Sequence, residues 1–432
     1  MKAQLAILLV ALSIASCKRT PPPVAQDAAP PPPPATAEVD AGRDAGHLGD
    51  APWNVVLVSI DSLRADMPWA GYERPIAPRL TELHKRSIAY TRGYSTSSFT
   101  SKSVGGLLTG RYPSELARNG YFFTRYLDPK EFLCTKLGAS NVPCIGGHAH
   151  AYFGVNQAGF EYGFSDWRLV RGITFDYETD PYVTSDKLTP LAIEMLKTQA
   201  AKSTPFFAWF HYMDPHDRYQ THAESPHFGK RLRDLYDEEV FFNDLWIGKL
   251  LDFIEGEEWG KRTVIVVTAD HGEAFGEHGL YKHAHEIWEV LVHVPLFFYV
   301  PGRPARTITE PRGHVDLAPT FAELLGAKIE LPGKSLVPEL EGAQPEARDV
   351  IVDLPEDQYN ERRRALIHGN MKIIAFGNDV RFSVFDLAED PDEKTDLWKT
   401  SPERAREMRD LYKEASRKIK DVPPRGGIPT KK

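Results

Sequence analysis

The sequence has few cysteines, no excess of positive charge and no long apolar run. It holds 3 Cys in 432 residues, and 60 Asp and Glu outnumber 52 Lys and Arg, for a net charge of −8. This charge balance lacks the basic footprint of nucleic-acid-binding proteins, so we expect no nucleic-acid partner. The apolar run LAILLVALSIAS near the N-terminus is too short to span a bilayer. With 42% hydrophobic residues, the chain still has enough apolar material for a large core.

The N-terminus has the features of an export signal. Lys2 precedes the apolar run, which ends in Ile-Ala-Ser-Cys at Cys17 and resembles a bacterial lipobox. We predict a signal peptide over 1–16, a lipidated Cys17, and a Pro/Ala-rich tether over 17–52. Acyl chains on Cys17 would anchor the protein in the lipid bilayer of the cell envelope, with the folded part outside the cytoplasm. The alternative is an ordinary secretory signal with an incidental cysteine.

The other two cysteines, Cys134 and Cys144, lie ten residues apart. Disulfides persist outside the cytoplasm, so the two thiols are free to pair there. The opposite outcome is equally open, because a helix-to-strand geometry would hold them too far apart.

The folded part alternates buried strands with helices, which predicts an α/β fold with a large, mainly parallel sheet flanked by helices. Helices are expected at 76–89, 189–200 and 233–256, and strands at 53–60, 142–147, 205–212, 263–269 and 294–300. After about residue 330, short strands at hairpin spacing (363–369, 371–377, 381–387) precede a polar helix at 402–419. We therefore expect a main domain over 53–330 and a small C-terminal α+β subdomain, with an antiparallel sheet, over 331–425.

Polar residues follow several of the predicted strands. Asp61 ends the first strand, and Asp270 and His271 end the strand at 263–269. Ligands of α/β sheets collect at the carboxyl ends of strands, and this mixture of carboxylates and imidazole suits a divalent metal without selecting one. The alternative for any single Asp at such a position is a helix N-cap.

Taken together, several segments resemble one family. The segments VSIDSLRAD, LLTGRYP, HYMDPHDRY, VVTADHGEAFGEHG and HVDLAPTFAELLG have the order and spacing of the sulfatase-like hydrolases of the alkaline phosphatase superfamily. The resemblance covers roughly residues 53 to 400. It implies a metal-dependent hydrolase of sulfuric or phosphoric esters, with 53–330 as its catalytic domain and an anionic ester as its substrate.

The resemblance also assigns residues. It implies that Asp61, Thr100, Asp270 and His271 bind a divalent metal ion (Ca, Mg, Mn or Zn), and that Thr100 is the nucleophile. Residues implied to contact the ester anion or the nucleophile are His216, His283, Lys102, His148 and His150. By contrast, His211, His278 and His285 are expected to orient loops or to satisfy hydrogen bonds in the core.

The chain departs from the sulfatase pattern at the nucleophile. Counting back from Gly110, Thr100 stands where sulfatases have the cysteine that becomes formylglycine, and Ser62 replaces a second ligand aspartate. Lys102 and Val104 replace the proline and arginine of the sulfatase segment. A threonine ester cannot be released by elimination as a formylglycine hydrate ester is, which favours phosphate esters. The alternatives are an inactive binding lipoprotein of this fold and a phosphoryl-group transferase.

Aromatic residues are dense in two predicted loops near the site. They include Tyr121, Phe122, Phe123 and Tyr126 in one loop, and Phe160, Tyr162, Phe164 and Trp167 in the next. Rings of this kind suit a sugar or a lipid in a pocket, and equally suit packing in a core.

Overall fold

A computed structural model describes residues 48, 49, 51–173 and 185–427. The signal peptide, Cys17 and nearly all of the tether lie outside the described residues. No helix within the described ranges is long and apolar enough to cross a membrane. The described residues form one compact unit that contains a large sheet, a four-stranded sheet and a two-stranded sheet.

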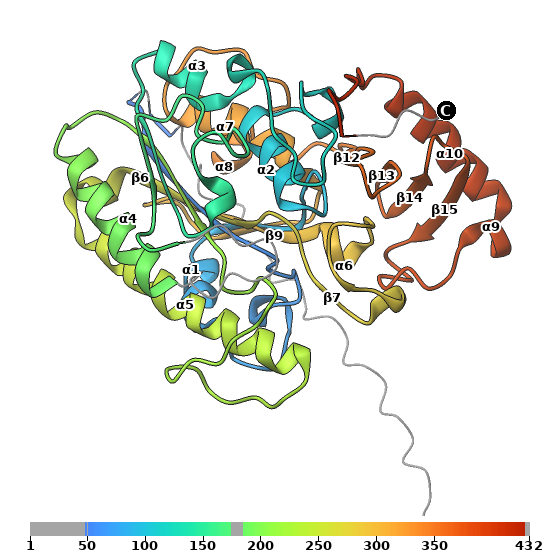
Figure 1. Ribbon diagram of the computed structural model, residues 1–432, viewed down its shortest axis with the longest axis horizontal. Coiled ribbons are helices and arrows are strands. Elements are labelled where there is room, and N and C mark those ends of the chain that lie inside the picture. Colours follow the sequence, from blue (N-terminus) through green and yellow to red (C-terminus); the bar gives the residue numbers. More distant parts are fainter. Residues whose placement is uncertain (1–47, 50, 174–184, 428–432) are drawn as a thin grey trace, which may run out of the picture. The chain divides into compact units, whose positions relative to one another are not determined.

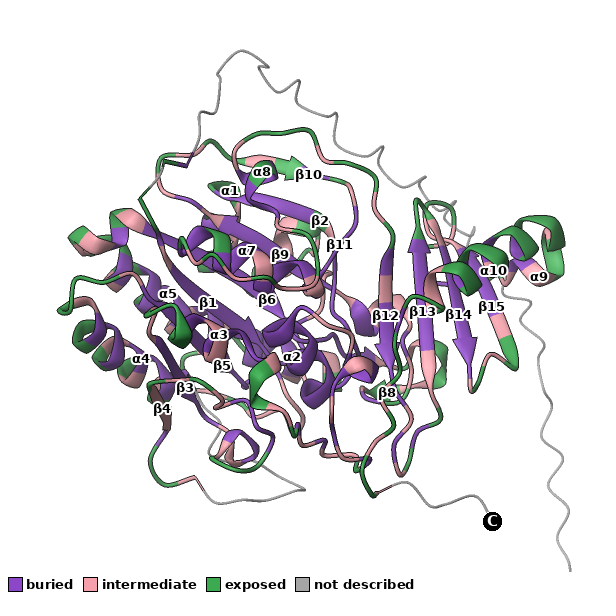
Figure 2. Cartoon of the chain, turned by 90° about the horizontal axis from the view of Figure 1, so that it is seen from above, coloured by how far each residue is buried: buried purple, intermediate pink, exposed green. Residues whose placement is uncertain are grey.

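The main element is a nine-stranded, mostly parallel sheet, as the sequence predicted. Its strand order is β10-β2-β9-β6-β1-β5-β3-β4, with β11 also paired to β2; β9 is antiparallel to both of its neighbours. The central strands are buried on both faces (Figure 2). The strands are β1 (Asn54–Ile60), β2 (Ile88–Tyr94), β3 (Cys144–His148), β4 (Asp166–Leu169), β5 (Phe207–Tyr212), β6 (Thr263–Ala269), β9 (His293–Tyr299), β10 (Arg306–Ile308) and β11 (Arg312–Gly313).

Helices cover both faces of this sheet. One layer contains α1, α4 and α5, and the opposite layer contains α2, α3, α7 and α8 (Figure 1). The helices are α1 (Pro78–Lys85), α2 (Thr100–Thr109), α3 (Leu133–Ala139), α4 (Ser185–Ala200), α5 (Leu232–Gly256), α7 (Leu317–Leu324) and α8 (Val337–Leu340). The architecture is therefore the predicted three-layer α/β fold.

The predicted helix at 76–89 was too long. Helix α1 ends at Lys85, and β2 begins at Ile88, where its residues pair with β9 and β10. The apolar side chains of Ile88, Ala89 and Tyr90 fit either a helix face or a buried strand, and pairing with two strands decides for the strand.

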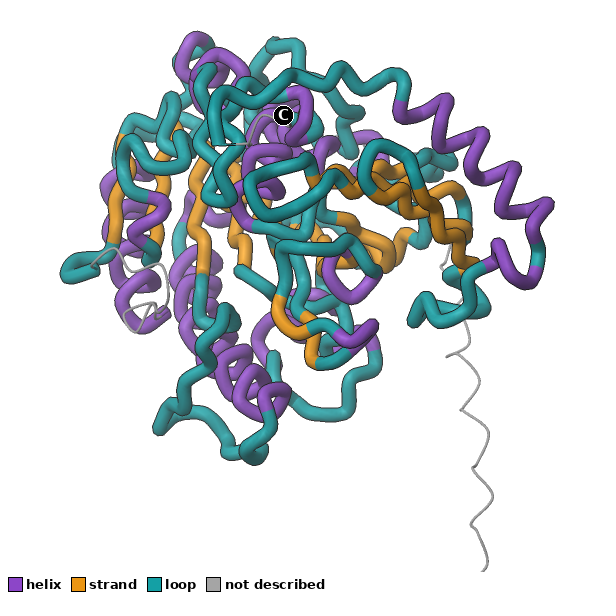
Figure 3. Tube along the Cα trace, turned by 45° about the vertical axis from the view of Figure 1, so that its right-hand side comes forward, coloured by secondary structure: helices purple, strands orange, loops and turns teal. Residues whose placement is uncertain are grey.

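An antiparallel sheet follows near the C-terminus, as predicted, and β12 (Val350–Leu354) adds a fourth strand to the three that the sequence indicated. Its order is β12, β13 (Arg363–His368), β14 (Met371–Phe376) and β15 (Arg381–Asp386). One face packs against α10 (Pro402–Ser416), which follows the short α9 (Leu397–Thr400) (Figure 3). The other face packs against apolar residues of 274–292, including α6 (Glu289–Val292). The small sheet thus supports the segment after His271.

The open question about the two cysteines is resolved. Cys134 in α3 and Cys144 at the start of β3 form a disulfide, with their Cα atoms 5.9 Å apart. The bridge fastens α3 to the large sheet.

Candidate active site

Two acidic residues follow neighbouring strands of the large sheet. The last residues of β1 and β6, Ile60 and Ala269, are register partners, so Asp61 and Asp270 leave the sheet side by side. Both side chains are completely buried. Burial and the negative charge of Asp61 raise the pKa of Asp270 well above its ordinary value. The register of the sheet therefore places two buried carboxyl groups side by side at its carboxyl edge.

Thr100 is the first residue of α2, and its hydroxyl lies next to Asp61 and His271. Its Oγ1 donates a hydrogen bond to Asp61 Oδ2 at 3.2 Å and lies 3.0 Å from His271 Nε2. Helix α2 is held close to its neighbours because a β-carbon at Gly105 or Gly106 would collide with other side chains. The two glycines thus permit close packing of the helix that carries Thr100.

One carboxylate oxygen of the cluster has no hydrogen-bond partner. Asp270 Oδ1 accepts hydrogen bonds from the backbone amides of His271 and Ser62, at 2.9 and 3.3 Å. Within the described ranges no group donates a hydrogen bond to Oδ2, and His271 Nε2 lies 3.4 Å from it. An unpaired buried carboxylate oxygen is costly, and a bound cation would remove that cost.

Ser62 adopts a strained backbone conformation at the centre of this group. Its φ is 57°, in the left-handed region that side chains other than glycine rarely occupy. In this conformation its hydroxyl donates to Asp61 Oδ1 at 2.8 Å and its amide donates to Asp270. Ser62 therefore ties the two carboxylates together, as strained residues at functional sites often do.

His211 holds Asp61 from the other side. Its Nε2 lies 3.4 Å from Asp61 Oδ2, and its Nδ1 is 2.7 Å from the hydroxyl of Ser59. The same hydroxyl accepts a hydrogen bond from the indole of Trp209, also at 2.7 Å. The sequence predicted that His211 satisfies hydrogen bonds in the core, and one of its contacts is with a predicted metal ligand.

A cavity of about 290 Å³ opens above Thr100. Asp61, His150, His216 and His283 contribute to its lining. The rings of His283 and His271 have centroids 4.2 Å apart, and those of His283 and His216 are 5.3 Å apart. Three histidines that the sequence assigned to the anion or the nucleophile thus lie around one cavity.

Glu273 fixes His283 from behind. The Nδ1 of His283 lies 3.2 Å from Glu273 Oε1, and Tyr219 donates to Glu273 Oε2 at 3.0 Å. Burial lowers the pKa of His283, but the charge of Glu273 and this hydrogen bond outweigh it, so that the pKa is raised. The pKa of His216 is lowered, chiefly by burial. His283 is therefore protonated more readily than His216.

Two family models match the chain. The model of the sulfatase family matches residues 53–327, and the model described as N-sulphoglucosamine sulphohydrolase, C-terminal, matches residues 276–421. The chain belongs to the sulfatase family. It is a hydrolase of that family, as the sequence predicted.

Several relatives support this membership. An ulvan-active sulfatase of Formosa agariphila is 26% identical over 69% of this chain and 67% of its own length. A choline-sulfatase of Rhizobium meliloti is 26% identical over 52% of this chain and 45% of its own length. The chain thus spans about two thirds of the first relative and less than half of the second.

Solved structures share the sulfatase fold with this chain. Ps i-CgsB superimposes with a TM-score of 0.70 at 20% identity, over 86% of this chain and 94% of that one. The phosphonate monoester hydrolase of Agrobacterium radiobacter gives 0.65 at 18% identity, over 86% and 96% of the two chains. At these identities the similarity shows the fold alone.

Two of the residues assigned to the sulfatase site do not line the cavity. The ammonium group of Lys102 is buried and lies 2.6 Å from the carboxylate of Asp357. His148 is packed among the rings of Phe153, Trp167 and Trp209, and its two ring nitrogens have no hydrogen-bond partner within the described ranges. Burial lowers the pKa of His148 well below its ordinary value. The structure places His148 in the apolar core as a neutral ring.

The loop histidines take structural positions. His278 stacks on Trp288, with centroids 4.0 Å apart. His285 lines the cavity and places Nδ1 2.7 Å from the side-chain oxygen of Asn360. Asn360 also donates to the backbone oxygen of Ala284, so the loop before β13 holds the residues that follow His283.

The sequence missed Glu273 and Asn360 as members of the site, and it missed Asp357 as the partner of Lys102. Glu273 stands two residues after His271, and this proximity was an available signal. Asp357 and Asn360 belong to the C-terminal subdomain and meet their partners across more than seventy residues, and their identity alone gives no signal.

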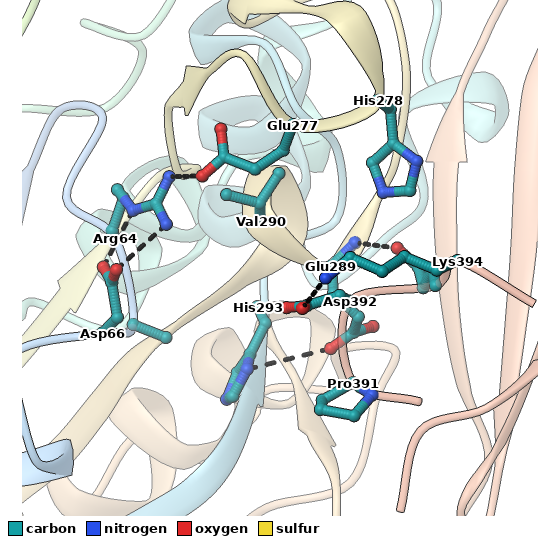
Figure 4. A pocket seen from close by; sticks show the side chains of 12 residues that line it. Arg64, Asp66, Glu277, His278, Glu289, Val290, His293, Pro391, Asp392 and Lys394 are labelled. Atoms are coloured by element: carbon teal, nitrogen blue, oxygen red, sulfur yellow. Dashed lines mark hydrogen bonds and ion pairs between the residues drawn. The ribbon is translucent and has the colours of Figure 1, made fainter. Parts of the chain in front are cut away.

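A second cavity, of about 400 Å³, lies between the two sheets (Figure 4). Arg64, Glu277, His293 and Asp392 contribute to its lining, and Arg64 is paired with Asp66 and Glu277. The segment 277–293 borders both cavities, which links the packing of the small sheet to the position of His283.

Proposed function

We propose that the protein is a metal-dependent hydrolase of anionic esters in which Thr100 is the nucleophile. The observation that carries the proposal is the position of the Thr100 hydroxyl. It opens a helix, bonds to Asp61, lies 3.0 Å from His271 and faces a cavity whose described lining includes four further histidines. Hydroxyl nucleophiles in enzymes are activated by such neighbours.

Asp61, Asp270, His271 and Thr100 fit a divalent cation. They supply carboxylate, imidazole and hydroxyl ligands, and the unpaired Oδ2 of Asp270 is a ligand atom without another partner within the described residues. His211 Nε2 also lies within 4.8 Å of ligand atoms of Asp61 and Asp270. When bound, the cation would lower the cost of forming the alkoxide and polarise the ester. Ca, Mg, Mn and Zn all fit this ligand set.

Asp61, His216 and His283 orient the nucleophile, bind the ester and protonate the leaving group in the proposed reaction. Asp61 Oδ2 accepts the hydrogen of the Thr100 hydroxyl, which turns the oxygen lone pairs away from Asp61. His216 Nδ1 is engaged by the backbone oxygen of Asp217, and His283 Nδ1 by Glu273, so each ring keeps Nε2 for the cavity. In this scheme the bound ester anion favours the protonated form of His216, whose Nε2–H binds a non-bridging oxygen, and His283 transfers its Nε2 proton to the oxygen of the leaving group. His150 borders the same space.

The nucleophile favours a phosphate ester or diester over a sulfate ester. Attack by threonine leaves a covalent ester on Oγ1 that water must cleave at the phosphorus or sulfur atom. A formylglycine hydrate has a second hydroxyl that expels the group by elimination, and threonine lacks it. In the alternative of a phosphoryl transferase, another acceptor attacks this ester in place of water. In the alternative of an inactive binding protein, the ester does not form.

Replacing Asp270 by asparagine should remove most of the bound metal. The substitution deletes a charged ligand, and a metal that binds only the folded state at about 100 times its Kd contributes about 2.7 kcal/mol to stability. We expect metal content by mass spectrometry, thermal stability in excess metal and turnover of an aryl phosphate to fall together. Asp244→Asn is the matched control, because Asp244 is also buried and accepts hydrogen bonds from two backbone amides, but belongs to neither group of described residues that could hold a metal ion. Equal metal content in wild type and Asp270→Asn would refute the ligand assignment.

We further propose that Cys17 is acylated and anchors the protein to the cell envelope, outside the cytoplasm. The disulfide between Cys134 and Cys144 supports an oxidising compartment. Cys17→Ser should transfer the protein from the membrane fraction to the supernatant. If the variant stays with membranes after a salt wash, the anchor is elsewhere.

A further inference from the structure

Four aromatic rings form a continuous surface in the cavity above Thr100. We call Phe99, Phe122, Phe123 and Tyr152 the aromatic wall. Successive ring centroids lie 4.2 Å, 5.5 Å and 5.3 Å apart, and all four residues line the cavity. Of the aromatic residues that the sequence left open between substrate and core, Phe122 and Phe123 thus face the cavity, whereas Tyr126 is buried in the core.

The aromatic wall starts at the nucleophile. Phe99 directly precedes Thr100, and Phe122 reaches outward to Tyr359, with centroids 5.7 Å apart. Tyr359 is 71% exposed, so the row of rings that begins at Phe99 ends at the surface of the protein. An ester whose anion sits at Thr100 therefore has rings along the direction in which its leaving group extends toward solvent.

The described lining offers no unpaired cation. Lys282 is the only lysine or arginine among the described residues that line the cavity, and its ammonium group lies 2.6 Å from Asp217. The ammonium of Lys102 lies behind the aromatic wall, 4.7 Å from the centroid of Phe99, and is bound to Asp357.

This cavity would bind a negatively charged leaving group weakly. A second sulfate or a carboxylate on the substrate would lose water and would find no unpaired lysine or arginine in the described lining. An apolar group would instead replace water against the rings.

We propose that the group esterified to the anion is uncharged and apolar, either an aryl ring or an alkyl chain, and that it packs on the aromatic wall. The proposal rests on the proposed function only for the position of the anion at Thr100. It distinguishes this protein from the relative named for its action on ulvan and from Ps i-CgsB, which has been crystallised with k-i-k-neocarrahexaose.

Binding of non-hydrolysable phosphonates tests the proposal without turnover. We expect metal-loaded full-length protein to bind benzylphosphonate at least about tenfold more tightly than methylphosphonate, and more tightly than 4-carboxybenzylphosphonate, by calorimetry. Octylphosphonate distinguishes an alkyl chain from an aryl ring as the preferred group. Equal affinity for benzyl and methyl compounds, or a preference for the carboxylated one or for the phosphonate analogue of a hexose 6-phosphate, would overturn the proposal.

Variants of the aromatic wall locate the effect. Phe122→Ala and Phe123→Ala should each weaken benzylphosphonate several-fold and leave methylphosphonate unchanged, whereas Phe122→Leu should keep most of the affinity. Val380→Ala is the control, because Val380 is apolar, 86% exposed and outside the cavity. Alanine variants that bind benzylphosphonate like wild type would place the apolar group elsewhere and refute the proposal. A protein that shows the binding preference but hydrolyses no ester would refute the proposed function and keep this inference.

Discussion

Thr100→Ala should lower kcat/KM for an aryl phosphate by at least about a thousandfold, a barrier increase of about 4 kcal/mol. The substitution deletes the hydroxyl that bonds to Asp61 and approaches His271, and no other hydroxyl has these two contacts among the described residues. Thr100 is 7% exposed, and shortening it at the first position of α2 removes little packing. The fold should survive, which circular dichroism and thermal unfolding check.

Thr100→Ser is the matched control for this loss. Serine keeps the hydroxyl and removes a methyl group, so its rate should stay within about tenfold of wild type. Ser101→Ala controls for substitution of a neighbouring hydroxyl, because Ser101 is buried in the same helix and does not line the cavity. Undiminished turnover by Thr100→Ala would eliminate Thr100 as the nucleophile.

The second large effect is expected at the buried pair of Lys102 and Asp357. Both side chains are 1% exposed, with Nζ and Oδ2 2.6 Å apart. Burial alone raises the pKa of Asp357, but the charge of Lys102 and backbone hydrogen bonds bring it below its ordinary value. Lys102→Met should therefore cost about 3–5 kcal/mol of folding free energy, because it leaves a buried carboxylate without its cation.

A double-mutant cycle tests this pair. Asp357→Asn should also destabilise the protein, and the double variant Lys102→Met/Asp357→Asn should be less destabilised than the sum of the two single variants. The exposed pair Lys261 and Glu258, 70% and 89% exposed, is the control and should contribute only about 0–1 kcal/mol. Additive effects at Lys102 and Asp357, measured by denaturant unfolding, would show that the pair is not coupled.

The sequence predicted the parts of the site that lie on strands. Asp61 and Asp270 each follow an apolar run that is typical of a buried strand. Because the two strands pair in parallel in one sheet, both residues lie at the same edge of it. Thr100 was found by its distance from Gly110, which is a property of the chain and needs no tertiary structure.

The contacts that cross the fold were not predictable from the residues. Lys102 was expected to contact the ester. It instead pairs with Asp357, which lies 255 positions away in the sequence, and this contact depends on how the C-terminal subdomain packs. His148 is the last residue of β3, a position that is typical of functional residues in α/β sheets. Its ring nevertheless belongs to the core, because it packs against Trp167 and Trp209. The boundary between α1 and β2 likewise depended on strand pairing.

The most direct test of the account is the rate of the wild-type, metal-loaded protein on two esters of the same phenol. We predict that the aryl phosphate is hydrolysed at least about tenfold faster than the matching aryl sulfate, a barrier difference of about 1.4 kcal/mol. The common leaving group keeps contacts with the aromatic wall equal, so the ratio reports on the chemistry at Thr100. A protein that hydrolyses the sulfate faster would contradict the account of Thr100.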